Sequence, residues 1–314
     1  MSILITGGAG FIGVELTREY LKRGEDIVIF DRQIVDSPLA EEKKVTLVRG
    51  DITSFTEVLN AVQQNSADTI FHLAAISSAA SEANPWASID INALGTYHIL
   101  EAARLFGVRK VVFSSSMGSY TLSKDTVVTE DTKQRPTLIY GVTKVFSELL
   151  GLYYARKFGI DFRGIRLPQV LGPHAKGFGF GQYNPWMIEA AIKGTPFEIW
   201  APPDTVLPLL YVKDAIRSFI MLCDAESSKL TTRVYNVGQI LPPPTAQDVL
   251  NETMKYYPDA KISFKPAPDA AVGLATIPRI ITGDAAEKEW GWHVGYSLEE
   301  AVKDFIEEYK KGIK

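Results

Sequence analysis

Short apolar runs alternate with segments of helical periodicity along the first half of the chain. The apolar runs, rich in β-branched and aromatic residues, predict strands at Ser2–Thr6, Asp26–Asp31, Val45–Asp51, Thr69–Ala75, Lys110–Ser116 and Asp161–Leu167. Apolar residues at helical spacing predict helices at Phe11–Arg23, Phe55–Gln64, Pro85–Phe106 and Ile139–Phe158. Because strands that alternate with helices pair in parallel, the pattern predicts an α/β fold with a doubly wound parallel sheet of six or seven strands.

The pattern changes after residue 167, where Gly and Pro break the sequence into small pieces. We expect residues 168–314 to form mainly a smaller, irregular C-terminal substrate lobe beside a domain at residues 1–167. Residues near 211–240 are expected to return to the first domain, with a helix beginning near Asp214 and a strand at Val234–Val237. An amphipathic helix is expected at Leu298–Lys311.

Composition and charge narrow the function classes. Lys and Arg total 33 against 37 Asp and Glu, a formal net charge of −4, which does not favour binding to nucleic acid or to an anionic membrane. The single cysteine, Cys223, excludes an intrachain disulfide framework, and the four histidines lack metal-ligand spacing, so no metal is expected. No apolar run approaches the ~20 residues that span a bilayer, and a glycine motif by residue 7 leaves no room for a secretory signal. We therefore expect a cytoplasmic enzyme that acts on a small molecule.

The strongest local signal is a glycine motif between the first strand and the first helix. Gly7, Gly10 and Gly13 have the spacing of a dinucleotide-binding turn of a Rossmann fold, where backbone and helix dipole face a pyrophosphate. Asp31 ends the second strand 18 residues after Gly13, near the ~20 expected of a carboxylate that binds a ribose 2′-hydroxyl. The motif therefore predicts NAD rather than NADP, a preference that Arg32 would soften. A tight turn without a ligand is the alternative.

A second constellation has the chemistry of a general base. Tyr140 and Lys144 are four residues apart at the start of a predicted helix, hence on one face, and a nearby cation favours the phenolate. Ser116 lies at the carboxyl end of a predicted strand, where ligands bind in doubly wound sheets. Together they predict a Ser-Tyr-Lys catalytic set.

These motifs, with Gly50-Asp51-Ile52, His72-Leu73-Ala74-Ala75 and Asn92, resemble the extended short-chain dehydrogenase/reductase family along essentially the whole chain. The resemblance implies that Asp51 and Ile52 flank adenine and that Asn92 supports the active-site helix. The cofactor-binding residues it implies are Gly7, Gly10, Phe11, Ile12, Gly13, Asp31, Arg32, Asp51, Ile52, Leu73, Ala74, Ala75, Asn92, Ser114, Tyr140, Lys144, Leu167 and Pro168.

Short motifs outside the catalytic set distinguish the dehydratases, epimerases and dehydrogenases of this family. The Asp-Glu pair of the dehydratases is missing after Ser116, and the arginine of the nucleotide-sugar epimerases is missing before Tyr211. Pro203-Asp204-Thr205 and Leu207-Pro208 are similar to the short-chain type of L-threonine 3-dehydrogenase, although residues 177–184 lack that branch's paired threonines. The resemblance implies contacts to substrate from Ser78, Ser116, Met117 and Tyr140, and a homodimer formed by the active-site helix. Gln182 and Tyr183 are candidates to bind a polyol or hydroxy acid through neutral hydrogen bonds, with a purely structural loop as the alternative.

We therefore expect an NAD-dependent oxidoreductase that interconverts a secondary alcohol and a ketone on a small polar substrate, such as a hydroxy-amino acid, sugar or polyol. Two alternatives stay open. One is a nucleotide-sugar 4-epimerase that keeps NAD tightly bound, and the other is a regulatory protein that binds NAD without turnover.

Overall fold

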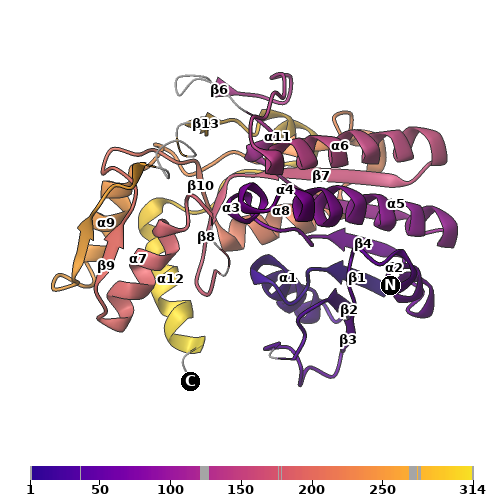
Figure 1. The fold of residues 1–314 in the computed structure, drawn as a ribbon, viewed down its shortest axis with the longest axis horizontal. Coiled ribbons are helices and arrows are strands. Elements are labelled where there is room, and N and C mark those ends of the chain that lie inside the picture. The colour runs from indigo at the N-terminus through magenta and orange to yellow at the C-terminus, as the bar shows by residue number, and fades with distance from the viewer. Residues whose placement is uncertain are drawn as a thin grey trace.

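A seven-stranded parallel sheet forms one side of the molecule, beside the smaller elements of the second half (Figure 1). The structure is a computed structural model that describes residues 2–35, 37–120, 127–175, 177, 179–268, 274 and 277–312. From edge to edge the strand order is β11 (Val234–Asn236), β7 (Asp161–Leu167), β5 (Lys110–Ser116), β4 (Thr69–His72), β1 (Ser2–Thr6), β2 (Asp26–Asp31) and β3 (Val45–Arg49). The predicted doubly wound sheet is thereby confirmed.

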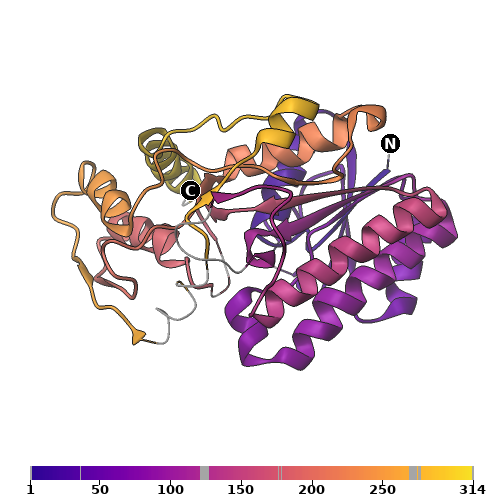
Figure 2. The same ribbon diagram turned by 90° about the horizontal axis from the view of Figure 1, so that it is seen from above.

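Helices cover both faces of the sheet, as Figure 2 shows in a view that separates the two layers. One face carries α1 (Phe11–Lys22) and α8 (Val212–Asp224), and the other α2 (Phe55–Gln64), α5 (Gly95–Phe106) and α6 (Ile139–Phe158). Successive strand residues point to opposite faces, so Ile3 and Ile5 join one core while Leu4 joins the other. The near-continuous apolar strands of the sequence follow from this burial on both faces.

The segment predicted as one helix, Pro85–Phe106, is divided. It comprises α4 (Pro85–Ser88), a π-helical segment η1 (Ile89–Leu94) and α5. The short α3 (Ser78–Ala83) precedes it, and Asn84 caps α4 by accepting a hydrogen bond from Ala87 N at 3.1 Å. The π turn contains Asn92, whose side chain is buried. Periodicity alone does not reveal such a bulge, which often marks a functional region.

The second half adds small sheets and helices beside the main sheet. Parallel pairs form between β8 (Gln169–Leu171) and β10 (Leu209–Tyr211), β9 (Phe197–Ile199) and β12 (Ile262–Phe264), and β6 (Val127–Val128) and β13 (Ile280–Ile281). Around them lie the 3₁₀ turns η2 (Met117–Ser119) and η3 (Ser227–Lys229) and the helices α7 (Tyr183–Lys193), α9 (Ala246–Met254), α11 (Asp284–Trp290) and α12 (Leu298–Gly312). Among the described helices, none is long and apolar enough to cross a bilayer.

Two predicted boundaries differ from the structure for identifiable reasons. The helix expected to begin near Asp214 begins at Val212, and the buried Asp214 carboxylate in its first turn accepts hydrogen bonds from Gly295 N at 2.9 Å and Tyr296 N at 3.1 Å. The strand expected to reach residue 75 ends at His72. There the chain leaves the sheet, and Ala74 N donates to Thr6 Oγ1 at 3.3 Å.

Candidate active site

The glycine turn lies at the point where the strand order reverses. After β1 the chain adds β2 and β3 on one side, and β4 and β5 on the other, so the carboxyl end of β1 faces the crevice in which such sheets bind ligands. Gly7 has φ of +68°, and a Cβ there would lie 2.8 Å from the Ala74 Cα. A Cβ on Gly13 would lie 2.5 Å from the Gly8 Cα. The turn therefore requires glycine at both positions.

The start of α1 offers an anion site next to this turn. Gly10 is the N-cap residue in extended conformation, and no side chain caps the helix. Backbone N–H groups at such an end, with the helix dipole, attract phosphate. This geometry fits the pyrophosphate of NAD, and Phe11 and Ile12 from the first turn line the adjoining cleft.

The residues expected around adenosine lie at the ends of β2 and β3. Asp31 accepts hydrogen bonds from Ala9 N at 3.1 Å and Gln33 N at 3.0 Å, so its carboxylate is tied to the glycine turn. Hydrogen bonds from Thr53 lower the pKa of Asp51 against the effect of burial. Arg32 is exposed, with its guanidinium 4.0 Å from Asp51. Two hydrogen-bonded carboxylates beside one exposed guanidinium suit ribose hydroxyls better than a 2′-phosphate.

His72 joins the cofactor turn to the helical layer. One ring nitrogen lies 2.7 Å from Thr6 Oγ1 and the other 3.0 Å from Thr96 Oγ1. Burial, aided by the charge of Lys144, lowers the pKa of His72 to about 3. The ring is therefore neutral and supports the structure beneath Leu73, Ala74 and Ala75, which follow it. Of these three, Ala75 is exposed.

Ser116, Tyr140 and Lys144 are brought together where β5 ends and α6 begins. Lys144 Nζ donates to Ser114 O at 2.7 Å and lies 5.5 Å from the centre of the Tyr140 ring. Ser116 accepts a hydrogen bond from Gly118 N at 3.1 Å. The close approach of η2 to α6 depends on Gly141, where a Cβ would lie 2.0 Å from Gly118 O.

Burial gives both titrating groups unusual pKa values. Burial raises the pKa of Tyr140, and a hydrogen bond with Ser116 opposes that rise. Burial lowers the pKa of Lys144 to about 8, and the Glu148 carboxylate opposes that fall. Burial thus disfavours the charged forms of both groups, so the phenolate depends on the hydrogen bond with Ser116 and on the Lys144 ammonium, which the Glu148 carboxylate favours.

A cleft of about 310 Å³ opens in front of these residues. The predicted site residues that line it are Phe11, Ile12, Ser78, Ser114, Ser116, Met117, Tyr140, Leu167, Pro168 and Gln182. Tyr183 is not brought there: it is 1% exposed and packs edge-on against Trp200, with ring centres 5.8 Å apart. Asn92 lies behind the cleft, where its side chain bonds to both Ile76 N and Ile76 O and reaches Thr143 at 3.4 Å.

Sequence reasoning missed several residues of this region. The cleft is also lined by Leu138, Gln169, Phe180 and Ile277. Gln169 follows Leu167 and Pro168 directly, so the same strand end could have indicated it. Glu148 was missed although it lies four residues after Lys144 on the same helix face.

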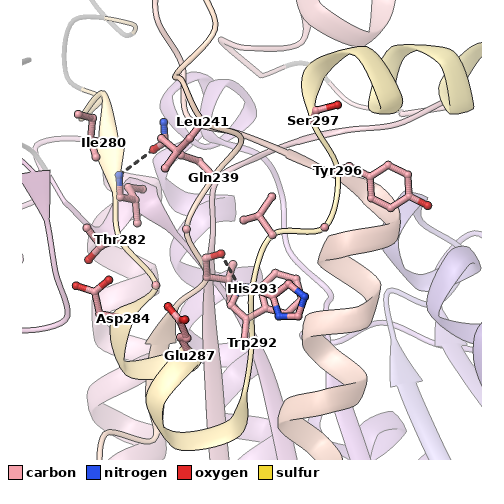
Figure 3. Close-up of a pocket in the computed structure, with 16 residues that line it drawn as sticks. Gln239, Leu241, Ile280, Thr282, Asp284, Glu287, Trp292, His293, Tyr296 and Ser297 are labelled. Carbon is pink, nitrogen blue, oxygen red and sulfur yellow. Dashed lines mark hydrogen bonds between the residues drawn. The ribbon is translucent and has the colours of Figure 1, made fainter.

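A larger cavity of about 480 Å³ lies elsewhere, beyond the edge strand β11. Figure 3 shows Asp284 and Glu287 on one side of it, and the rings of Trp292, His293 and Tyr296 on the other. None of the residues predicted for cofactor or substrate lines it. The smaller cleft, where the reactive side chains meet, is therefore the candidate active site.

Comparisons with known proteins agree with this geometry. The model of the family described as "NAD dependent epimerase/dehydratase family" matches residues 3–238. The chain is 31% identical to the mitochondrial L-threonine 3-dehydrogenase of Bos taurus over 307 residues, 97% of this chain and 81% of that protein.

Two solved structures superpose along nearly the full length. The GalE-like L-threonine dehydrogenase of Cupriavidus necator, in its holo form, has a TM-score of 0.90 at 27% identity, covering 98% of this chain and 99% of that one. A monomeric L-threonine 3-dehydrogenase from a metagenome has a TM-score of 0.91 at 27% identity, covering 99% and 100%. A family match over most of the length, on the fold and turn described above, shows that the chain belongs to the NAD-dependent epimerase/dehydratase family and is an NAD-dependent enzyme.

Proposed function

We propose that the protein is a dehydrogenase that oxidises a secondary alcohol on a small polar substrate to a ketone, and catalyses the reverse reaction. The observation that carries the proposal is that Ser116 and Tyr140 line one cleft beside the glycine turn, with the buried Lys144 Nζ 5.5 Å from the centre of the Tyr140 ring. NAD, when bound, accepts the hydride of the carbinol carbon. The relatives named as L-threonine dehydrogenases support a hydroxy-amino acid as substrate, and the proposal also includes a sugar or a polyol.

The residues of the chain have separate tasks in this proposal. Tyr140 takes the proton of the substrate hydroxyl at its phenolic oxygen, and Ser116 orients that hydroxyl. Lys144, held by Ser114 O at 2.7 Å, supplies the positive charge that favours the phenolate. NAD is held by the glycine turn and by Asp31, with Arg32, Asp51 and Ile52 beside the adenosine.

The substrate is held, in this proposal, by neutral polar groups. Ser78 at the start of α3 and Gln182 before α7 both line the cleft with Met117. The Gln182 amide donates to Ala175 O at 3.1 Å, which fixes its place in the loop. Hydroxyl and amide groups pair with the hydroxyls of a polyol or with the polar ends of a hydroxy acid.

The test is reduction of NAD, followed at 340 nm, with a panel of L-threonine, related hydroxy-amino acids, polyols, aldoses and sugar acids. We expect NADH with one class of small alcohol, and NAD that exchanges freely on dialysis. UDP-glucose is included and followed by NMR. Retained NAD, an epimerised UDP-sugar and no NADH would refute the dehydrogenase in favour of a 4-epimerase.

We also propose that the protein forms a homodimer through α5 and α6. Val142, Phe146, Leu149 and Tyr153 follow a helical spacing on α6 and are 43% to 60% exposed. Leu94, Tyr97 and Leu105 lie exposed on and before the neighbouring α5. A contiguous exposed apolar face favours burial against a second copy, although one structural relative is described as monomeric.

A further inference from the structure

A buried polar network lies directly behind the catalytic side chains. Glu148 follows Lys144 by four residues and Tyr140 by eight, so the three share one face of α6. Its carboxylate is 1% exposed and accepts hydrogen bonds from three other segments. The donors are Ser115 Oγ on β5, Arg166 on β7 and, at 2.8 Å, Gln134 Nε2 from the loop before α6.

Arg166 completes this network. Its Nη2 and Nε donate to Glu148 at 2.8 Å and 3.0 Å, and its Nη1 donates to the Tyr120 hydroxyl at 2.7 Å. Removing two charges from water costs free energy that their attraction often only offsets, so apolar residues could serve stability equally well. An ion pair at this place is therefore better explained by its effect on the neighbouring catalytic groups.

We propose, on the basis of the function proposed above, that Glu148 is a positioning residue of the active site. Its carboxylate fixes the end of β5 through Ser115 and keeps Lys144 in the charged form beside Tyr140. Glu148 touches neither substrate nor cofactor in this scheme and acts only through these neighbours.

The first effect follows from the register of β5. Ser115 stands between Ser114, whose carbonyl oxygen accepts from Lys144, and Ser116, which hydrogen-bonds Tyr140. The Ser115 hydroxyl donates to Glu148 on the opposite side of the strand. Anchoring Ser115 therefore limits rotation of the strand end and sets the distance between Ser116 and the phenol.

The second effect is electrostatic. Lys144 faces Tyr140 and Glu148 from its own helix, His72 from β4, and the Ser114 carbonyl oxygen and Phe113 ring from β5. His72 is neutral because its pKa is lowered to about 3, so it offers no counter-charge. The Glu148 carboxylate is the group that raises the pKa of Lys144 against burial.

The charged groups next to Glu148 also affect the pKa of Lys144. Arg166 faces Glu148 from β7, and its charge also interacts with Glu130, whose pKa is raised by burial. Removing the Glu148 carboxylate leaves the Arg166 charge unbalanced, which disfavours the Lys144 ammonium further. Both consequences lower the pKa of Lys144.

Direct titration of Lys144 tests this without a substrate. Full-length protein with ¹³C-labelled lysine is titrated by NMR with saturating NAD, and the Lys144 signal is assigned as the one absent from Lys144→Met. We expect Glu148→Gln to lower the Lys144 midpoint by about one pH unit. The control Asp161→Asn weakens the ion pair with Arg163 at the other end of β7 and should leave the midpoint unchanged.

A second variant covers a failure of Glu148→Gln to fold. Glu148→Gln combined with Arg166→Met removes both charges, and we expect it to fold and still to lower the midpoint. An unchanged Lys144 midpoint in whichever variant folds would overturn the electrostatic part. This readout stands even if no substrate is oxidised, so failure of the proposed function is distinguished from failure of this inference.

Ser115→Ala tests the anchoring of the strand separately. We expect kcat to fall about tenfold, with little change in KM or in the Lys144 midpoint, because the Ser115 hydroxyl donates to Glu148 although the residue itself lines the cleft. Wild-type kcat in this variant would overturn the anchoring part.

Discussion

At the scale of single residues, burial rather than residue type decides what Tyr140 and Lys144 can do. A free phenol has a pKa near 10, and burial raises that of Tyr140, whereas burial lowers that of Lys144 to about 8. The hydrogen bond with Ser116 opposes the change at Tyr140. The two groups thus depend on their neighbours in the cleft for a useful proton affinity.

Replacing Tyr140 by Phe removes the proposed base and leaves the ring. We expect turnover to fall by about 100- to 10,000-fold, with NAD affinity nearly intact. Steady-state kinetics and calorimetric NAD binding measure the two effects. Tyr256→Phe, at an exposed tyrosine after α9, is the control. Substantial turnover by Tyr140→Phe would show that another group takes the proton.

Asp31 is expected to decide between the two nicotinamide cofactors. Asp31→Ala should weaken NAD by about tenfold and NADP less, since the charged hydrogen bonds to the ribose are lost while a repulsion is removed. Asp31→Asn is the matched variant, because it can keep the bond from Ala9 N. Equal weakening of both cofactors by Asp31→Ala would contradict this role.

At the scale of elements, the strand, glycine turn and helix at the start of the chain were predictable from the sequence. The motif, the strand before it and the helix after it were all predicted, and the close approach of Gly13 to Gly8 explains why no side chain fits. Gly13→Ala should lower the free energy of unfolding by about 1–3 kcal/mol and abolish tight NAD binding. Chemical denaturation measures the first effect and calorimetry the second.

Gly10→Ala is the graded control for that substitution. Its Cβ would meet only Gly7 O, at 3.1 Å, so the loss of stability should be smaller. If Gly10→Ala destabilised the protein as much as Gly13→Ala, close packing at Gly13 would not be the cause.

Other parts of the site were beyond sequence reasoning for physical reasons. The helix expected at Pro85–Phe106 contains a π turn, in which Asn92 bonds across to Ile76, a contact that periodicity does not encode. Tyr183 was expected at the substrate because its hydroxyl can form neutral hydrogen bonds with a polyol or hydroxy acid, yet it begins α7 and is buried. Local patterns predict turns and strand ends, whereas they do not predict which face of a later helix meets the core.

At the scale of the whole molecule, the apolar face of α5 and α6 predicts the oligomeric state. Light scattering of the wild type should show a dimer, and Leu149→Glu should yield a monomer because Leu149 is 60% exposed at the centre of that face. Leu241→Glu is the control, since Leu241 is 68% exposed beside the other cavity. A wild-type monomer would contradict the proposed dimer.

The first 167 residues supply six of the seven strands, and the second half returns to the sheet with α8 and β11. We propose that the remainder of the second half acts as the substrate lobe, because Gln169, Phe180 and Gln182 come from it to close the cleft. Substitutions of these three residues should therefore alter which substrate is oxidised, without altering NAD binding at the glycine turn.

The central claim is hydride transfer from a secondary alcohol within the cleft that Ser116 and Tyr140 line, with the buried Lys144 beside Tyr140. The most direct measurement uses the active alcohol of the substrate panel with deuterium on its carbinol carbon. We predict that the wild type yields reduced cofactor carrying the deuterium, detected by mass spectrometry, and that Tyr140→Phe yields almost none. Reduced cofactor without the label, or equal labelling by Tyr140→Phe, would contradict the account.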